Sequence, residues 1–426
     1  MNICIFEDET YRKLLPLVHL RPVYDLRCGI TTLKEKITRA LAGNTFILHM
    51  RNYLQETQRE RNKGTCVNDI PREVDRLLLI NGRLLSVGDF VKECGSEGAD
   101  RLFVRGNTLI GARLSAGNLE NLRKGFGEKL IGLSDFPSIE REEVEDAGLI
   151  TFPWELVHRN GAQIVSDFQI QTQGKPRISG KVYDGAHLLN PTEIHIAEDA
   201  QVKPGAVLDA EDGPIYVAEG VKIMPNAVIK GPAFIGRNSV IRVAGKIYEN
   251  TTIGEGCKVG GEIEESIIHA HSNKQHEGFI GHSYLGEWVN IGADSNNSDL
   301  KNNYGSVKVF VDGLFVDTGS QFVGLVMGDH SKCGINSMFN TGTVVGVCCN
   351  LFGAGMPPKF IPAFSWGGAE DGLTTYRLEK AVEVARRVMA RRNMTLAACE
   401  ETLLRNVFEM TMEDRASAGA RDETAS

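Results

Sequence analysis

The chain has 426 residues, of which 42% are hydrophobic and 24% charged, with a formal net charge of −8 at pH 7. This composition is ordinary for a folded soluble protein and excludes collagen, coiled-coil and disordered chains, while the length suggests two or three domains. The acidic balance argues against a general nucleic-acid-binding surface, so no nucleic acid is expected as a partner.

The first 170 residues alternate strand-like and helical patterns. Apolar runs at residues 2–6 and 77–80 predict buried strands, and a helical pattern covers residues 31–41. This alternation predicts an α/β layer domain over residues 1–170. Neither a P-loop nor a GxGxxG motif is present. Arg21 and Arg27 follow the first strand, and such arginines either clamp phosphate or form ion pairs.

Three features indicate a cytoplasmic protein. The nine cysteines are scattered without a CxxC pair, which favours reduced thiols. Glu7 and Asp8 stand where a signal peptide would need an apolar core. The uncharged stretch 333–358 contains three asparagines and five glycines, which a lipid-facing helix tolerates badly. We therefore expect no membrane partner.

An aliphatic residue recurs every six positions in the second half. A period of six fits neither a helix nor a pleated sheet, but it fits a solenoid with three short strands per coil. We predict a left-handed parallel β-helix over residues 171–367, in which each inward Ile or Val contributes roughly 1.5–3 kcal/mol by burial. The longest unbroken run is Val217, Ile223, Ile229, Ile235, Ile241, Ile247, Ile253 and Val259.

The repeat is interrupted twice, between Val259 and Leu285 and again after Ala293. Interruptions of a solenoid form loops on one face, which is often the binding face. After the last coil, apolar spacings of three and four predict C-terminal helices over residues 368–412. The final segment 413–426 has little apolar content and is expected to be disordered.

Sequence blocks in both halves resemble one family. These blocks are FEDETYRKLLPLVHLRPVYDLRCGITTLKEK, FPWELVHRN, GHSYLGEWVNIGADSNNSDLKNNYGSVK and GDHSKCGINSMFNTGTVVGVCCNLFGAGMPPKFIP. They are similar to the GlmU-like, bifunctional N-acetylglucosamine-1-phosphate uridyltransferase/glucosamine-1-phosphate acetyltransferases, in their alternative Bacteroidetes-type branch. The resemblance spans nearly the whole chain and implies a sugar nucleotidyltransferase domain followed by an acyltransferase β-helix, assembled as a homotrimer.

The resemblance also implies an acetyl-transfer site in the β-helix, with acetyl-CoA as cosubstrate and an amino sugar 1-phosphate as acceptor. QHEGFIG followed by VNIGAD places the general base at His276. The remaining family positions imply that Asn290, Asn303, Tyr304 and Lys308 bind substrate.

A histidine near its ordinary pKa of about 6.5 is suited to removing a proton from an amine. Two other interpretations of the histidine-rich region stay open. His269, His271, His276 and His282 fall close together and could bind zinc, or they could be structural. His330 lies within a hexad and is expected at a corner or at a trimer interface.

For the first domain, the resemblance implies Mg²⁺-dependent transfer from a nucleoside triphosphate to a sugar phosphate. This sequence departs from the family there: the Gly-rich loop is missing, and Asn81 stands where a Gly-Asp carboxylate would hold the metal. Arg21, Asp25 and Arg27 are the predicted nucleotide-binding residues, and no metal ligand is assigned. Two alternatives remain: a nucleotidyltransferase whose β-helix only oligomerises or binds an effector, and a non-catalytic sugar-nucleotide-binding scaffold.

Overall fold

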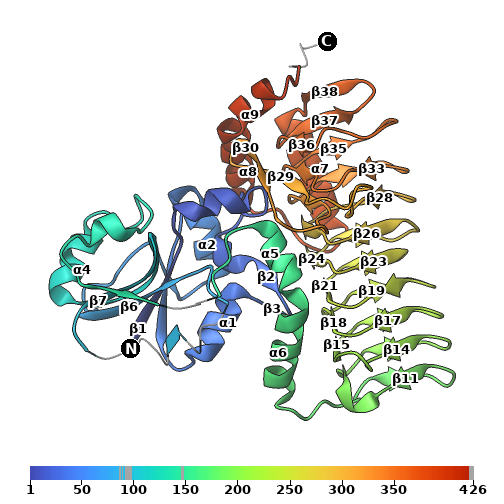
Figure 1. Cartoon of the computed structure of the whole chain (residues 1–426), viewed down its shortest axis with the longest axis horizontal. Helices are drawn as coiled ribbons and strands as arrows, with labels where there is room; N and C mark the ends of the chain where they lie inside the picture. Colours follow the sequence, from blue (N-terminus) through green and yellow to red (C-terminus); the bar gives the residue numbers. More distant parts are fainter. Residues whose placement is uncertain (86–87, 89, 92–97, 145–147, 422–426) are drawn as a thin grey trace.

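The computed structural model describes residues 1–85, 88, 90–91, 98–144 and 148–421 (Figure 1). An α/β domain lies beside a long β-helix, and the C-terminal helices pack near the last coils, on the side that faces the α/β domain. The predicted fold class is confirmed in both halves. Among the described residues no helix is both long and apolar enough to cross a membrane.

The α/β domain is built on a seven-stranded sheet with strand order β5-β4-β1-β6-β8-β7-β9. Strands β5, β4, β1 and β6 run parallel, and β8 is antiparallel to β6 and β7. The strands are β1 (Asn2–Phe6), β4 (Thr45–His49), β5 (Cys66–Val67), β6 (Arg76–Asn81), β7 (Arg101–Arg105), β8 (Thr108–Ser115) and β9 (Arg141–Glu143). A small hairpin joins β2 (Arg27–Cys28) to β3 (Thr31–Thr32).

Helices surround this sheet and lead into the β-helix. They are η1 (Glu9–Leu14), η2 (Val23–Asp25), α1 (Leu33–Ala40), η3 (Asn52–Leu54), α2 (Gln55–Arg61), α4 (Ala116–Arg123), η4 (Leu133–Asp135), α5 (Pro153–His158) and α6 (Asn160–Thr172). Helix α1 begins with a complete capping box between Thr32 and Glu35, which explains its start. Helix α6 runs along the coils and ends at Thr172, just before the first coil (Figure 1).

The β-helix has three faces, called here face 1, face 2 and face 3 in chain order. Face 1 contains β10 (Lys181–Val182), β13 (Gln201–Val202), β16 (Lys222–Ile223), β19 (Val240–Ile241), β22 (Lys258–Val259), β25 (Asn273–Lys274), β32 (Lys332–Cys333), β35 (Asn350–Leu351), β37 (Ser365–Gly368) and the antiparallel β38 (Gly372–Thr375). The bridge from Asn273 through Asn290 to Lys332 joins its two parts.

Faces 2 and 3 complete each coil. Face 2 contains β11 (His187–Leu189), β14 (Val207–Asp209), β17 (Val228–Lys230), β20 (Lys246–Ile247), β23 (Glu262–Glu264), β26 (Phe279–Gly281), β28 (Asn296–Asn297) and β33 (Met338–Phe339). Face 3 contains β12 (Ile194–Ile196), β15 (Ile215–Val217), β18 (Ala233–Ile235), β21 (Thr251–Ile253), β24 (Ile267–Ala270), β27 (Tyr284–Glu287), β31 (Val326–Met327), β34 (Val344–Val345) and β36 (Phe360–Ile361). The one-turn helix η5 (Pro191–Glu193) precedes β12.

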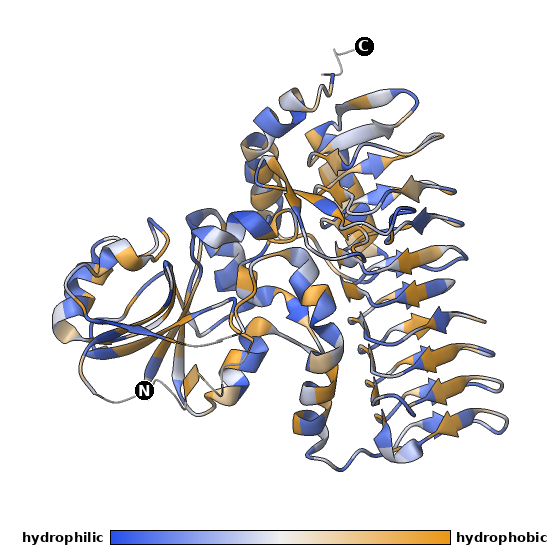
Figure 2. Ribbon diagram, in the orientation of Figure 1, coloured by the Kyte–Doolittle hydropathy of each residue, from blue (hydrophilic) through white to orange (hydrophobic). Residues whose placement is uncertain are grey.

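The aliphatic residues of the six-residue repeat line the lumen of this solenoid. Ile223, Ile235 and Ile241 are fully buried, and each stacks on its equivalent in the next coil. Figure 2 shows the hydrophobic colouring concentrated on the strands of these coils. Several corners are turned by Asn, Asp or His residues with positive φ, such as Asn238 and His282, because these side chains tolerate the left-handed conformation.

The second predicted interruption is an inserted segment after β28 that returns at β31. It contains the antiparallel hairpin β29 (Lys308–Val311) and β30 (Leu314–Asp317), which contacts η1 of the α/β domain. Val307, Val309 and Val323 of this segment join the same hydrophobic core as the α/β domain. The insertion therefore packs between the two domains.

Three helices close the chain: α7 (Leu378–Ala390), α8 (Ala398–Met410) and α9 (Met412–Ser417). Helix α8 packs on α7, α2 and η3. The segment 413–426 differs from its expectation, because α9 is ordered and buries Arg415, whose guanidinium donates to Thr411 at 2.8 Å. Residues 422–426 lie outside the described residues.

Replacing Ile241 with Ala is expected to lower the free energy of unfolding of the β-helix by about 2–5 kcal/mol, because it leaves a cavity in a closed stack. Val243→Ala, two residues away in the same coil, is the matched control, since Val243 is 57% exposed. Urea unfolding followed by circular dichroism measures both. Equal losses in the two variants would contradict the lumen assignment.

Candidate functional site

The corner between faces 2 and 3 carries a histidine oriented by a carboxylate. His282 Nδ1 lies 2.9 Å from Asp299 Oδ2, one coil further on. A carboxylate only accepts, so Nδ1 carries the hydrogen, and in the neutral imidazole Nε2 has the lone pair. Nε2 has no hydrogen-bond partner among the described residues. It is also not one of the fully buried polar atoms that lack a partner. The pair is therefore built as a base with its orienting group.

Two aromatic rings flank this histidine at the edge of the insertion. The His282 ring stacks on Phe322 at 5.0 Å, and His158 of α5 meets it edge-on at 6.4 Å. His158 Nε2 is held 2.9 Å from the carbonyl oxygen of Phe322. The side chain of His282 keeps 12% of its surface exposed, so it opens to solvent beside these rings.

Two carboxylates, those of Asp299 and Glu264, lie close to His282. Burial raises the pKa of Glu264, His282 opposes this shift, and Asp299, Glu249 and Glu265 add to it. Glu264 also receives the backbone N–H of His282 at its carbonyl oxygen, at 3.2 Å. An acidic surrounding of this kind attracts a cation and repels an anion. The corner therefore suits the ammonium end of a ligand.

His276, the base predicted from sequence, lies at a different corner, between faces 1 and 2. It is exposed, and its ring makes no hydrogen bond with a described residue. Its turn is held from inside by Lys274, which occupies a lumen position opposite Val259. The Lys274 ammonium donates to the carbonyl oxygens of His276 at 2.6 Å and Glu277 at 2.9 Å, and burial lowers the pKa of Lys274 to about 8.

The other histidines of the region are structural. His269 is buried, its Nδ1 is 3.0 Å from the hydroxyl of Tyr284, and burial lowers its pKa well below the usual value. His271 and His330 stack on the two sides of Trp288 at 4.5 and 6.1 Å. The described residues contain no group of three or more His, Cys, Asp or Glu side chains placed to hold a metal ion.

The four residues predicted to bind substrate divide between two places. Asn290 is exposed on face 1, between Asn273 and Lys332. Asn303, Tyr304 and Lys308 lie on the insertion, where Tyr304 is 66% exposed and the Asn303 side chain accepts from Gly305 N in a local turn. The insertion also carries Phe322, which stacks on His282. Their roles in substrate binding remain predictions.

The residues predicted to bind nucleotide all have protein partners. The buried guanidinium of Arg21 is 2.7 Å from Asp329 and 3.3 Å from Glu287, both on the β-helix. Arg27 pairs with Glu255 of the β-helix at 2.9 Å. Asp25 pairs with Lys34 at 2.8 Å. This geometry favours the ion-pair alternative, in which the two arginines join the domains, and nucleotide binding by these three residues stays a prediction.

The carboxyl edge of the α/β sheet, where open sheets bind their ligands, is filled by ion pairs. Arg51 pairs with the buried Glu7 at 3.1 Å, and Arg83 pairs with Asp8. The Asn81 amide donates to the same Asp8 carboxylate at 2.8 Å. A hard divalent cation needs free oxygen ligands. These carboxylates are already neutralised, so the described residues of this edge do not fit Mg²⁺.

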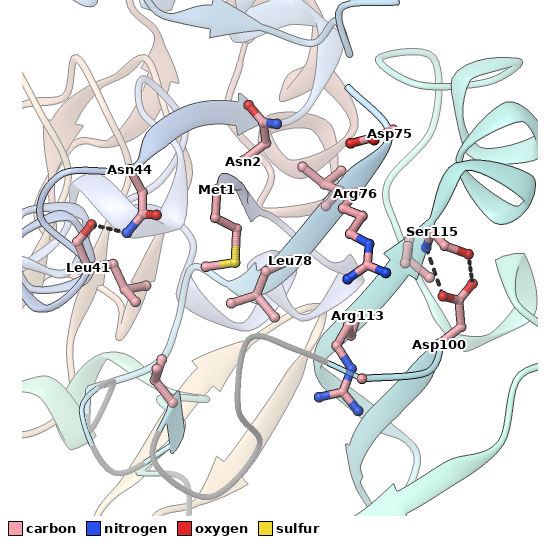
Figure 3. Close-up of a pocket in the computed structure, with 14 residues that line it drawn as sticks. Met1, Asn2, Leu41, Asn44, Asp75, Arg76, Leu78, Asp100, Arg113 and Ser115 are labelled. Atoms are coloured by element: carbon pink, nitrogen blue, oxygen red, sulfur yellow. Dashed lines mark hydrogen bonds between the residues drawn. The ribbon is translucent and has the colours of Figure 1, made fainter. Parts of the chain in front are cut away.

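A pocket of about 470 Å³ lies at the opposite edge of the sheet, by the amino ends of β1 and β6 (Figure 3). Arg76 and Arg113 line it together with Leu78, and Asp100 holds Ser115 on its rim. The pocket is far along the strands from the edge at which parallel sheets bind nucleotides. We assign it no role.

Residues 3–176 match the model of a family described as sugar nucleotidyl transferase. The "Bifunctional protein GlmU" of Bartonella quintana (strain Toulouse) is 23% identical over 285 residues, which are 65% of this chain and 59% of that protein. The "Bifunctional sugar-1-phosphate nucleotidylyltransferase/acetyltransferase" of Sulfurisphaera tokodaii is 30% identical over 158 residues, 37% of this chain and 38% of that protein.

Among solved structures, Francisella novicida UDP-N-acetylglucosamine acyltransferase shares 13% identity and covers 58% of this chain and 92% of its own, with a TM-score of 0.27. That score is too low to add to the assignment. These comparisons find the similarity to GlmU-type proteins that the sequence predicted, over part of the chain. The chain spans about three fifths of the length of the Bartonella relative.

The sequence pointed to His282 as one of four clustered histidines, but His276 was predicted as the base. The signal that would have identified it is Asp299, which follows 17 residues later, close to one coil of the repeat. Side chains one coil apart at the same corner lie side by side, so a His and an Asp at this spacing predict a pair. The hexads blur at this interruption, which hides the spacing.

Replacing Arg21 with Met is expected to lower the free energy of unfolding by about 3–5 kcal/mol, because the buried Asp329 carboxylate loses its cation. Arg12→Met is the matched control: its ion pair with Glu9 is exposed and contributes less than about 1 kcal/mol. The double variant R21M/D329N should recover part of the loss. Urea unfolding tests this, and equal effects of the two single variants would contradict it.

Stability is expected to fall as the pH drops below about 6.5. Several histidines stay neutral in the folded protein at pH values at which they are protonated in the unfolded chain. Burial lowers the pKa of His330 to about 3, with Lys332 and Arg21 also lowering it and Glu287 opposing them. The folded pKa lies below the unfolded one, so the stabilisation is complete above pH 6.5 and declines toward pH 3.

His330→Gln should therefore reduce the slope of the free energy of unfolding against pH between pH 6 and 5. The expected reduction is about 1.4 kcal/mol per pH unit, which corresponds to about one proton fewer bound on unfolding. Denaturant titrations at pH 7, 6 and 5 measure the slope. An exposed histidine, as in His276→Gln, provides the control. An unchanged slope in the His330 variant would show that this histidine is protonated in the folded protein.

Proposed function

We propose that the β-helix transfers an acetyl group from acetyl-CoA to the amino group of an amino sugar 1-phosphate, with His282 as the general base. The observation that carries this proposal is the pair of His282 Nδ1 and Asp299 Oδ2 at 2.9 Å. The name of the Sulfurisphaera relative supplies the acetyltransferase class, and the family resemblance of the sequence supplies the amino sugar 1-phosphate acceptor. His276, the base predicted from sequence, has no comparable orienting group among the described residues.

The reaction needs one proton acceptor at a fixed place. The lone pair of His282 Nε2 takes a proton from the acceptor's amine while the nitrogen attacks the thioester carbonyl carbon. The tetrahedral intermediate then loses the CoA thiolate as the carbon–sulfur bond breaks, and the thiolate takes the proton from Nε2. The products are the N-acetylated sugar phosphate and free CoA; an acceptor that arrives as an ammonium releases one further proton to water.

Asp299 holds the imidazole in the tautomer that this step requires. Its carboxylate accepts from Nδ1 and stabilises the imidazolium that forms when Nε2 takes the proton. The carboxylates of Asp299 and Glu264, which lie close to His282, favour the positive charge of the incoming amine. Asn303, Tyr304 and Lys308 are proposed substrate residues on the insertion that borders this corner, and Asn290 is proposed on face 1.

A second activity is proposed for the α/β domain, transfer of a nucleotidyl group from a nucleoside triphosphate to a sugar phosphate. The match of residues 3–176 to the sugar nucleotidyl transferase family favours it. Mg²⁺ belongs to this proposal only by family likeness, and no step is assigned to it because Asp8 and Glu7 are neutralised by arginines. A homotrimer in the cytoplasm is the proposed form of the protein.

His282→Ala is expected to reduce CoA release from acetyl-CoA and glucosamine 1-phosphate by about 10²–10⁴-fold, the usual contribution of a general base. Asp299→Asn should lower the rate by about 100-fold or more, because an amide at Nδ1 favours the tautomer with hydrogen on Nε2. His276→Ala is the matched control and should keep nearly full activity. Thiol release measures all three, and circular dichroism checks the fold.

Loss of activity in the His276 variant with retention in the His282 variant would overturn this base assignment and support the sequence-based one. The nucleotidyl proposal is measured separately, as pyrophosphate release from a panel of nucleoside triphosphates with N-acetylglucosamine 1-phosphate and Mg²⁺. CoA release without pyrophosphate release would leave acetyl transfer standing and remove nucleotidyl transfer. Pyrophosphate release alone would support the alternative in which the β-helix oligomerises or senses an effector.

A further inference from the structure

Four cations gather on face 1, one coil before the turn of His276. This cation cluster consists of Arg242, Lys258, Arg391 and Arg392. Lys258 lies on β22 opposite Asn273 of the next coil. Arg391 and Arg392 follow directly after α7, so the end of this helix is brought against the β-helix at that rung.

The position of Arg392 is fixed by two hydrogen bonds. Its guanidinium donates to the carbonyl oxygen of Gly256 at 2.6 Å and to Asn273 Oδ1 at 2.8 Å. Gly256 is two residues before Lys258, and Asn273 is its neighbour across the sheet. Arg392 is thereby anchored within the Lys258 rung.

Arg242 reaches the same rung from the preceding coil. A Cβ placed on Gly260 would lie only 2.9 Å from Cβ and 3.2 Å from Cγ of Arg242, so the arginine side chain lies over this glycine. Gly260 follows Lys258 by two residues. The absence of a side chain at Gly260 makes room for Arg242 beside Lys258.

The cluster has no counter-ion in the part of the chain that the structure describes. The nearby carboxylates are engaged elsewhere, Glu255 with Arg27 and Glu277 with Lys246. Burial lowers the pKa of Lys258, and Arg392, Arg391 and Arg242 lower it further. Arg242 and Arg391 are exposed, so the charges face solvent.

The mutual repulsion of these four cations is unfavourable. A chain of net charge −8 contains enough carboxylates to neutralise them, yet none is placed at the cluster among the described residues. The dipole of α7 accounts for basic residues at its carboxyl end. It does not account for Lys258 and Arg242, which come from two coils of the β-helix. A bound anion would relieve the repulsion of all four.

We propose that the cation cluster binds the phosphate or diphosphate group of a ligand. Guanidinium groups offer paired donors matched to phosphate oxygens, and an ammonium adds a compact charge. Asn290, one rung beyond Asn273, adds a neutral amide on the same face. Two sources carry this chemistry, the phosphates of coenzyme A and the diphosphate of a nucleotide.

The test is calorimetric titration of the full-length protein with inorganic pyrophosphate. The double variant K258Q/R391Q should bind at least about 100-fold more weakly, since each charge-assisted contact is worth about tenfold or more. Arg392 is left intact because it anchors α7. Arg237→Gln is the matched control, an exposed β-helix arginine outside the cluster. Raising the salt concentration should weaken wild-type binding.

Absence of pyrophosphate binding in the wild type would overturn the proposal. Equal weakening by the control variant would also overturn it, by showing general attraction. Coenzyme A, dephospho-coenzyme A and uridine diphosphate distinguish the sources. Weaker binding of the dephospho form assigns the site to the 3′-phosphate of the coenzyme, and equal binding of uridine diphosphate assigns it to a diphosphate. Because H282A keeps the cluster, its binding of pyrophosphate separates this proposal from that of acetyl transfer.

Discussion

The stacking of one aliphatic residue every six positions is the constraint on which the rest of the structure depends. It closes the lumen and forces a corner after each short strand, so that residues one coil apart meet at the same corner. His282 and Asp299 meet in this way at a corner. Lys258 and Asn273, also one coil apart, are neighbours on face 1. The repeat thereby brings residues 15 to 17 positions apart into contact without any long-range folding of the chain.

The two domains are joined by charge as well as by apolar packing. Arg21 and Arg27 enter the β-helix side and pair with Asp329, Glu287 and Glu255. Buried pairs of this kind are costly to break because a lone charge then stays in the interior. Their effect is to fix one arrangement of the α/β domain and the β-helix.

The period of six is local information, which is why the sequence alone predicted the β-helix and the place of its interruptions. The partners of Arg21 lie some 270 to 310 positions away, and nothing in the local pattern indicates them. The sequence suggested phosphate or ion pairing for this arginine, and only the structure supplies the carboxylates. For His282 the information was present as a one-coil spacing to Asp299, but the irregular hexads concealed it.

The β-helix separates its charges, and this bears on how two ligands would be arranged. The carboxylates of Asp299 and Glu264 lie close to His282 at the corner of faces 2 and 3, and the cation cluster lies on face 1. One face of about six residues spans roughly 20 Å, at about 3.3 Å per residue. An amino sugar phosphate is too short to place its amine at His282 and its phosphate at Lys258 of the same chain. An acyl donor with a long extended arm is long enough to span this distance. The cluster therefore suits the donor's phosphates, and the acidic corner suits the acceptor's amine.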